Sequence, residues 1–331
     1  MFSSKATDQL AFVSRQLSGL LVDEPVEPAL QRLSKASPPQ YARDIEYLRS
    51  LLSGSTHRVE RYGRNPYRTL AKLLPAATHA KSELFRNFIA YVQQNKLILD
   101  AYWSGVFGIV AYFAWLVVVA IQVTAIFGVF VLPGMQQMYA NFGERLPQLT
   151  ATLFASGGFG VPLLVVVLAV FLVLAVWFVV LFRRRINAVA PLPRWLAWLP
   201  FMGTVTKTYN LNLFLNFTRA LIDSRVETRQ AVDLAAAASN QPVSLNIGSL
   251  AAGDFGAASD PALTELSIAA RLNRFEQEVE FQCEQHSHRL SAALIRTRDR
   301  FSLVLKFILY VFIGTLVVAM YLPIFKMGTV L

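Results

Sequence analysis

Five residues in the last third of the chain have the side chains that metal binding or catalysis would need: Cys283, His286 and His288, with Glu280 and Glu284 beside them. On a helix, Cys283 and His286 share one face, because residues three and four apart are neighbours. Glu280, Glu284 and His288 fall on a second face. The chain has no second Cys/His pair to complete a four-ligand zinc site. The spacing predicts a polar helix surface, with a metal site or a membrane enzyme as the alternatives.

Other signatures of enzyme chemistry are absent from the sequence. It has no G-x-x-x-x-G-K-[ST] loop, so nucleotide hydrolysis by that route is not expected. The glycine-rich stretch 157–160 has no Lys or Arg nearby to hold a phosphate. We therefore predict no catalytic residue, no cofactor and no metal. Cys283 is the lone cysteine, so no disulfide is expected.

Three stretches without a charged residue dominate the rest of the chain: 101–143, 146–182 and 307–325. Each contains an apolar core long enough to cross a bilayer as a helix, which takes roughly 20 residues. Because the apolar residues come in blocks, the sequence predicts an integral membrane protein. The N-terminus is polar and lacks the apolar core of a signal peptide, so insertion is expected to depend on these internal spans.

The basic residues lie outside these stretches. Residues 1–103 hold 14 Lys and Arg and residues 183–302 hold another 14, out of 31 in the chain. This is the positive-inside pattern, so we attribute the net charge of +10 to topology and membrane-surface contact, and predict no nucleic-acid partner. Six arginines beside the spans are expected to meet the membrane surface from the cytoplasm: Arg183, Arg184, Arg185, Arg296, Arg298 and Arg300.

The predicted architecture is an all-α polytopic membrane protein, with three transmembrane helices and two duplicated cytoplasmic helical-bundle domains. The N-terminus would be cytoplasmic and the C-terminus periplasmic. The expected segments, in chain order, are cytoplasmic domain 1–103, span 104–132, short periplasmic segment 133–159, span 160–182, cytoplasmic domain 183–302, span 303–325 and periplasmic tail 326–331.

Both cytoplasmic regions have the periodicity of helices. In the first, apolar residues recur at helical spacing over 10–21 and again over 41–52, with prolines between the two. A long helix is expected to start near Ala77 and to continue into the first span. In the second region, 249–260 predicts a loop, and 261–300 predicts a charged helix that continues into the third span.

The second cytoplasmic region repeats the pattern of the first. Four pairs of residues share an offset of 204: Arg15 and Arg219, Leu17 and Leu221, Val22 and Val226, Leu30 and Leu234. The span ends match as well, since the sequence Val131-Leu132-Pro133 resembles Tyr321-Leu322-Pro323. These matches indicate a tandem duplication of a helical domain followed by a span. The second span would bring the second copy back to the cytoplasm.

The spans offer little to a transported solute. Transporters and proton pumps place ionisable residues deep within the bilayer, and the stretches 101–143, 146–182 and 307–325 have no Asp, Glu, Lys or Arg. Gln122 and Thr124 are the main polar residues of the first span, and we expect them to hydrogen-bond to other helices or to backbone carbonyls. A transporter or channel subunit stays as a distant alternative. Four small residues would permit close approach between spans: Gly105, Gly108, Gly128 and Gly314.

The chain resembles the inner-membrane platform family shared by type IV pilus and type II secretion machines, the type II secretion system F protein family. Four motifs, spread over nearly the whole chain, carry the resemblance. They are the segment after the first span with Pro133 and Leu146-Pro147, the domain entry Leu199-Pro200-Phe-Met-Gly203, the helix containing Phe217-Thr-Arg219, and the ending Tyr321-Leu322-Pro323.

This resemblance implies a non-enzymatic platform for type IV pilus assembly in a bacterial inner membrane. Its implied partners are a cytoplasmic hexameric assembly ATPase, pilin or pseudopilin subunits and other inner-membrane assembly proteins, and it is expected to form a homo-oligomer. A type II secretion platform acting on pseudopilins is the alternative; the start of the first domain almost at residue 1 favours the pilus. In place of the family's Gly-Glu-x-x-Gly-like segment the chain has Ala252-Gly-Asp254-Phe-Gly256, which marks a divergent member.

Overall fold

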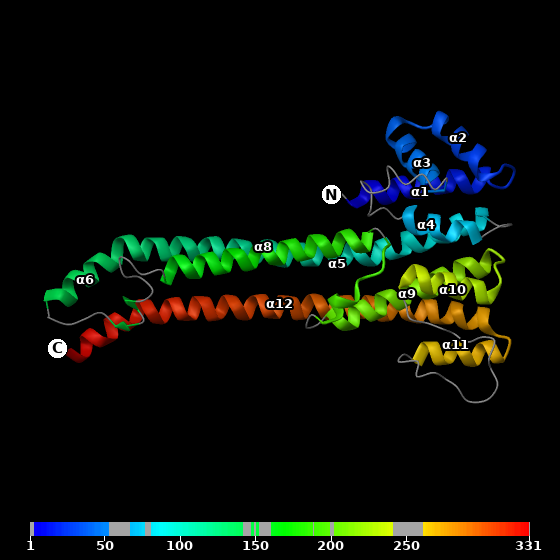
Figure 1. Ribbon diagram of the computed structural model, residues 1–331. Helices are drawn as coiled ribbons and strands as arrows, with labels where there is room; N and C mark the ends of the chain where they lie inside the picture. Colours follow the sequence, from blue (N-terminus) through cyan, green and yellow to red (C-terminus); the bar gives the residue numbers. More distant parts are fainter. Residues whose placement is uncertain are drawn as a thin grey trace. The chain divides into compact units, whose positions relative to one another are not determined.

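Every regular element that the structure describes is a helix, and the described ranges contain no strand, which confirms the all-α prediction. The chain divides into two compact units (Figure 1): unit 1 comprises 1–102 and 182–297, and unit 2 comprises 103–181 and 298–331. The unit boundaries fall within a few residues of the ends of the basic segments 1–103 and 183–302. The computed structural model describes residues 3–52, 67–76, 81–141, 147–148, 150–151, 160–187, 189–198, 202–240 and 261–330.

Unit 1 begins with four helices: α1 (Ser3–Leu20), α2 (Val26–Ala36), α3 (Pro39–Leu52) and α4 (Tyr67–Leu73). The two helical segments that apolar spacing predicts here are confirmed. Proline sets two of the starts, because Pro25 lies immediately before α2 and Pro39 is the first residue of α3. At these positions the missing N–H of proline removes no helical hydrogen bond. α2 packs against α1 and α3, and α3 packs against α4.

The second part of unit 1 contains a short 3-10 helix, η4 (Arg194–Trp198), followed by α9 (Met202–Asp223), α10 (Thr228–Ser239) and α11 (Pro261–Arg271). α9 packs against α10 and η4, and α10 contacts α4. A tight turn joins α9 to α10: Arg225 has a left-handed backbone with φ 58°, and the Val226 N–H donates to the Leu221 carbonyl at 3.1 Å. This arrangement satisfies carbonyls at the end of α9.

Two long helices have residues in both units, and both are long and apolar enough to cross a membrane. α5 (Lys81–Ile126) confirms the predicted helix that continues into the first uncharged stretch, and α12 (Phe275–Val330) does the same for the third. α8 (Gly160–Asn187) contains the shorter apolar segment Ala169–Arg183.

The first apolar helix continues past Leu132–Pro133, the predicted end of the first span. A π-helical turn, η3 (Phe127–Val131), leads there into α6 (Leu132–Asn141) without a break. In the π turn the Leu132 N–H donates to the carbonyl of Phe127, five residues earlier instead of four. The wider turn lies directly before Pro133, which has no N–H to donate. The expected continuous helix 261–300 is interrupted after α11, because Asn273 adopts a left-handed backbone with φ 57°.

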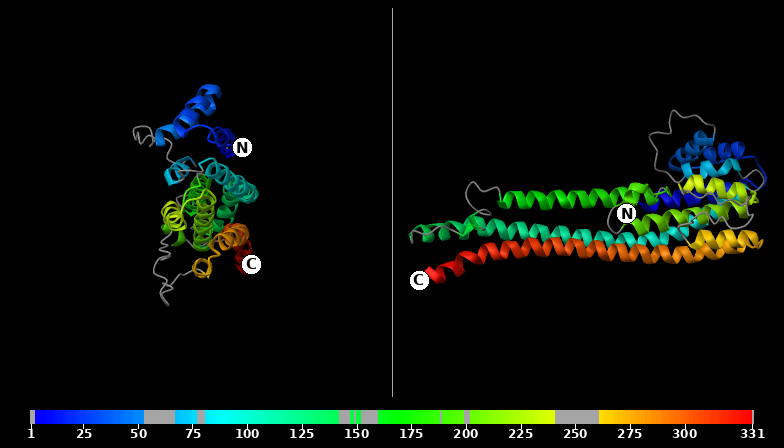
Figure 2. Two further views of the ribbon diagram at one scale, coloured as in Figure 1. Left: turned by 90° about the vertical axis from the view of Figure 1, so that its right-hand side faces the viewer. Right: turned by 60° about the horizontal axis from the view of Figure 1, so that its bottom comes forward.

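In unit 2, the helices α5, α8 and α12 run side by side (Figure 2). A cluster of buried side chains joins α5 to α12, and Phe171 and Leu172 of α8 pack against it. Thr124 donates its hydroxyl proton to the Ala120 carbonyl at 2.8 Å, which confirms the expected hydrogen bond to backbone. The cluster consists of Phe113, Val117, Ala120, Leu305, Leu309 and Phe312.

Candidate functional site: a polar pocket between α5, α9 and α12

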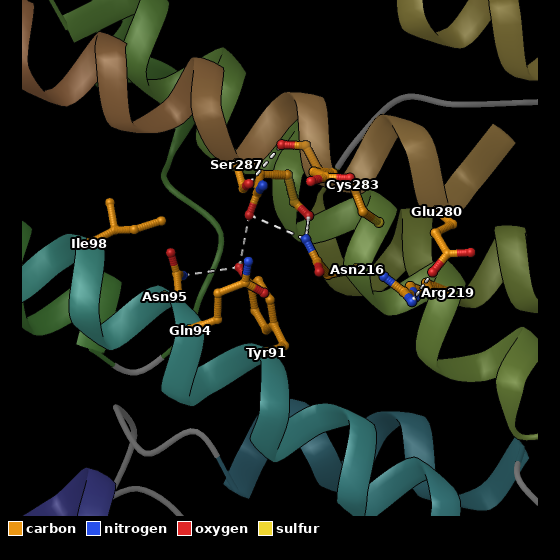
Figure 3. Close-up of a pocket in the computed structure, with 11 residues that line it drawn as sticks. Tyr91, Gln94, Asn95, Ile98, Asn216, Arg219, Glu280, Cys283 and Ser287 are labelled. Atoms are coloured by element: carbon orange, nitrogen blue, oxygen red, sulfur yellow. Dashed lines mark hydrogen bonds and ion pairs between the residues drawn. The ribbon is translucent and has the colours of Figure 1, made fainter. Parts of the chain in front are cut away.

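A pocket of about 180 Å³ lies within unit 1 where α5, α9 and α12 meet (Figure 3). Tyr91 and Asn95 reach it from α5, Arg219 reaches it from α9, and Glu280 and Cys283 reach it from α12. Most of its lining is polar, which is unusual for the meeting point of three helices. The full lining is Tyr91, Gln94, Asn95, Ile98, Asn212, Asn216, Arg219, Glu280, Cys283, Glu284 and Ser287.

A chain of hydrogen bonds crosses from α5 to α9 at this pocket. The Asn95 amide donates to the Tyr91 hydroxyl at 3.1 Å, and that hydroxyl donates to Asn212 Oδ1 at 3.2 Å. The Asn216 amide donates to the backbone carbonyl of Asn212 at 2.8 Å. Burial, together with nearby Tyr209 and Cys283, raises the pKa of Tyr91, so its hydroxyl stays protonated and can donate.

Asn212 has one polar atom left over. Its side chain is 1% exposed, and its Nδ2 atom has no hydrogen-bond partner among the described residues. A buried donor without an acceptor costs about 1–3 kcal/mol, so native proteins rarely leave one empty. The pocket that Asn212 lines is polar and large enough for water or for a small polar group that would accept this hydrogen bond.

Arg219 connects α9 to α12 at the rim of the pocket. Its guanidinium donates to Glu280 Oε1 at 2.6 Å and lies 3.9 Å from Asp223 Oδ2. The two side chains of the closer pair are 43% and 65% exposed, so the pair contributes less than about 1 kcal/mol to stability. Asp223 also accepts a hydrogen bond from Asn87 of α5 at 3.1 Å. Burial raises the pKa of Asp223 and several nearby carboxylates add to the rise, while Arg219 opposes it.

Below this polar layer the contact is aromatic. Phe88 of α5 stacks on Phe217 of α9 with ring centroids 6.2 Å apart, and Tyr91 meets Phe217 edge-on at the same distance. Phe88 and Phe217 are almost completely buried. The pocket therefore rests on a packed hydrophobic layer, which fixes Tyr91 and the helices that carry the amides.

The cluster of Cys283, His286 and His288 does not converge on one point. Cys283 lines the pocket, and burial raises the pKa of its thiol to about 12, so it is not a reactive thiolate at neutral pH. His286 is buried, with Nδ1 3.1 Å from the Gln282 carbonyl, and His288 is exposed. Among the residues that the structure describes, no three His, Cys, Asp or Glu side chains are placed to hold a metal ion.

The structure gives a role to residues of two sequence motifs, the one that ends at Gly203 and the one that contains Arg219. A Cβ atom at Gly203 would lie 3.0 Å from the Ala197 carbonyl oxygen, so glycine allows the close approach of α9 to η4. Asn210 holds the preceding segment by bonding both the N–H and the carbonyl of Leu192, at 2.8 and 3.0 Å. Arg219 belongs to the pocket. Leu199 and Pro200 lie outside the described residues.

The ending Tyr321-Leu322-Pro323 lies inside α12, and Pro323 leaves the Ala319 carbonyl without its usual helical donor. The Thr150 hydroxyl donates to that carbonyl at 2.7 Å, and the Tyr139 hydroxyl donates to the Pro323 carbonyl at 2.5 Å. Both donors belong to the segment 133–159, where Pro147 is buried and Pro133 lies in the first turn of α6. Leu146, like the stretch 249–260 with Asp254, lies outside the described residues.

The arginines predicted at the membrane surface lie on two helices. Arg183, Arg184 and Arg185 are in the last turns of α8. Arg296, Arg298 and Arg300 are in the middle of α12, and Arg298 pairs with Asp299 at 3.0 Å. The asparagines of the pocket were not predicted from the sequence. A signal for two of them is the pattern over 212–216, where Asn212 and Asn216 flank Leu213, Phe214 and Leu215.

Searches of protein-family models, of curated proteins and of solved structures give no match to this chain.

Proposed function

We propose that this protein is a non-enzymatic platform of the bacterial inner membrane that couples a cytoplasmic hexameric ATPase to the insertion of pilin into a type IV pilus. The observation that supports it best is the pair of long helices. α5 and α12 each start among the charged helices of unit 1 and continue without a break into uncharged apolar sequence. Movement that the ATPase imposes on unit 1 would pass along these two helices to pilin in the bilayer.

The pocket fits a mechanical role better than a catalytic one. Its nucleophile candidate, Cys283, is buried with a raised pKa, and the nearby His286 is bonded to backbone. Its polar bonds instead tie α5, α9 and α12 to one another. Because hydrogen bonds and exposed ion pairs are individually weak, such a joint can hold the helices and still rearrange under load.

The proposed topology has three spans, with 104–132, 160–182 and 303–325 in the bilayer. α8 supplies the second span, and its terminal arginines 183–185 stop translocation at the cytoplasmic surface. The N-terminus is then cytoplasmic and the C-terminus periplasmic. The one-sided distribution of Lys and Arg supports this orientation.

Matching burial within α1 and α9 supports the proposed duplication, although the pair that follows these helices differs, since Val22 is 71% exposed and Val226 is 9% exposed. Val13 and Phe217, Ser14 and Thr218, and Leu17 and Leu221 are pairs at the offset of 204, and all six are buried. α1 and α9 contribute these residues, and each is followed by a shorter helix, α2 or α10.

Deletion of the gene tests the function directly. Surface pili should disappear while pilin is still made and inserted into the membrane, and normal piliation without the gene would reject the proposal. If secretion of a folded protein is lost instead, the type II secretion alternative, with pseudopilins as cargo, replaces it. Genes for a prepilin, a prepilin peptidase and an assembly ATPase beside this gene would favour the pilus.

Reporter fusions test the topology separately. A reporter that is active only outside the cytoplasm should be active when fused after Gln148 and silent when fused after Ala258. Activity at both positions would reject the proposed return through α8.

A further inference from the structure

Unit 2 contains a groove between α5 and α12 that is polar at one end and apolar at the other. Two adjoining pockets of about 660 and 470 Å³ form it, and they share Gly105, Ile109, Ser302, Lys306 and Tyr310. From Arg298 to Tyr310 the α12 side of the groove is about 18 Å long, at roughly 1.5 Å per residue.

The polar end carries one uncompensated positive charge. Arg298 is paired with Asp299 at 3.0 Å. Lys306 has no ion pair among the residues that the structure describes. It is exposed, and it immediately precedes the uncharged stretch 307–325. Among the described residues, the groove therefore has a net charge of one positive unit, carried by Lys306 at the start of the most apolar part of α12. The Ser302 hydroxyl lines the groove beside it.

The apolar end of the groove has exposed aromatic side chains and free space beside a glycine. Phe307 and Tyr310 are 65% and 67% exposed. Tyr310 lines the same pocket as Leu305 and Leu309 of the buried cluster. Gly108 lines this end, and a Cβ atom there would meet nothing within 4 Å. At the polar end, by contrast, a Cβ at Gly105 would lie 2.9 Å from Arg298 Cδ, so glycine lets the Arg298 stem pack across α5. Gly105 thus lets Arg298 close the polar end of the groove, and Gly108 leaves the apolar end open.

We propose that this groove binds one anionic phospholipid. Its phosphate lies against Lys306 and Ser302, and an acyl chain follows Ile109, Phe307 and Tyr310. The charge decides the occupant: a zwitterionic lipid brings no net charge to neutralise Lys306, whereas an anionic headgroup does so at the interface where basic residues attract such lipids. An uncharged apolar helix would fill the apolar end but leave Lys306 unpaired. The proposal rests on the membrane placement of unit 2 proposed above.

The test is native mass spectrometry of the purified full chain, titrated in detergent with phosphatidylglycerol or with phosphatidylcholine. We expect one phosphatidylglycerol to bind about five-fold more tightly than phosphatidylcholine, the effect of one lysine near a membrane surface. Lys306→Gln should remove this preference and Lys306→Arg should keep it. Arg289→Gln removes a charge from the same helix, outside the groove and away from the arginines expected at the membrane surface, so it should also keep the preference. Inorganic phosphate should not displace the lipid, because it lacks the acyl chain.

Two glycine variants test the apolar end. Gly108→Leu places a side chain at the groove where a Cβ atom meets nothing within 4 Å, and it replaces a poor helix former by a good one. It should weaken binding of both lipids at least ten-fold. Gly314→Leu, at another open glycine of the apolar stretch, should leave binding unchanged.

Equal binding of the two lipids by the unaltered chain, or a preference that survives Lys306→Gln, would overturn the proposal. So would a Gly108→Leu variant that binds lipid normally but changes from dimer to monomer, because the groove would then hold a second copy of the chain. Resistance of the protein to alkaline extraction from membranes checks the placement independently. If the protein inserts but shows no lipid preference, the lipid site fails and the platform proposal stands.

Discussion

Helices α1 and α9 place buried residues at corresponding positions, but the pockets beside these two helices differ in charge. Arg219 of α9 faces Glu280 of α12 and lines a pocket with two carboxylates. The corresponding Arg15 of α1 lines a pocket of about 370 Å³ together with Arg86 of α5, and that pocket has no carboxylate. Neither Arg15 nor Arg86 has an ion pair among the described residues.

The shared packing and the different charge of the two pockets have separate causes. Packing positions such as Leu17 and Leu221 follow from helical spacing, so both helices share them. The charge of each pocket is decided by the long helix beside it, α5 for Arg15 and α12 for Arg219. Among the described residues, Arg219 is paired with a carboxylate and Arg15 is not, so we expect Arg15 to be the one that an acidic partner binds.

The largest expected contrast concerns thiol reactivity in the two pockets. Burial raises the pKa of Cys283 from 9.0 to about 12, so its thiolate is about a thousandfold scarcer at pH 8 than that of an ordinary cysteine. A cysteine introduced at Ser18, in the pocket with Arg15 and Arg86, should react much faster with N-ethylmaleimide, because the arginines favour the thiolate.

The measurement is the alkylation rate of the folded full chain, with Ser18→Cys studied in a Cys283→Ala background. The rate at Cys283 should keep rising with pH beyond pH 10, whereas that at residue 18 should level off earlier. Equal rates at pH 8 would mean that the two pockets are alike in burial and charge.

Aromatic packing should be the next largest difference. Phe217→Ala removes a ring in contact with Phe88 and Tyr91, and should lower the free energy of unfolding by about 3–5 kcal/mol. At the corresponding position, Val13→Ala should cost about 2 kcal/mol, because fewer buried carbons are lost. Chemical denaturation of both variants in the same detergent would measure the two losses in free energy of unfolding. A larger loss for Val13→Ala would mean that α1, and not α9, is the better-packed helix.

Removal of the buried hydroxyls of Thr218 and Ser14 should change the free energy of unfolding in different directions. Thr218 donates to the Phe214 carbonyl at 2.9 Å, while Ser14 Oγ has no hydrogen-bond partner among the described residues. Thr218→Val should therefore lower the free energy of unfolding by about 1 kcal/mol, and Ser14→Ala should leave it unchanged or raise it slightly. The same denaturation measurement applies. A clear loss of stability in Ser14→Ala would mean that this hydroxyl is bonded in solution.

Removing the two arginines should have the smallest effect on stability. Arg219→Ala should cost less than about 1 kcal/mol, because the pair with Glu280 is largely exposed, and the loss should shrink at high salt. Arg15→Ala should cost nothing, since it relieves repulsion from Arg86. If Arg15→Ala proved the more destabilising variant at low salt, the first pocket would have to contain a carboxylate.

The sequence predicted helices where the apolar period was clear, as in α1, α3 and the long helices α5 and α12. Details of the backbone were not predictable in this way. A π turn carries the first apolar helix past Pro133, and the break at Asn273 has no glycine or proline to mark it in the sequence. The pocket was not predicted because asparagines 95 and 212 are far apart in sequence, and neither carries a charge that a pattern would mark.

The sequence alone determined the helical class and the segregation of charge from apolar runs, because both follow from local composition and period. Only the tertiary structure decided that residues 1–102 and 182–297 form one unit, and that Thr150 supplies the donor that Pro323 removes. It also decided that Cys283 is buried beside amides instead of facing a base. These features depend on distances between residues remote in the chain, and only packing brings such residues together.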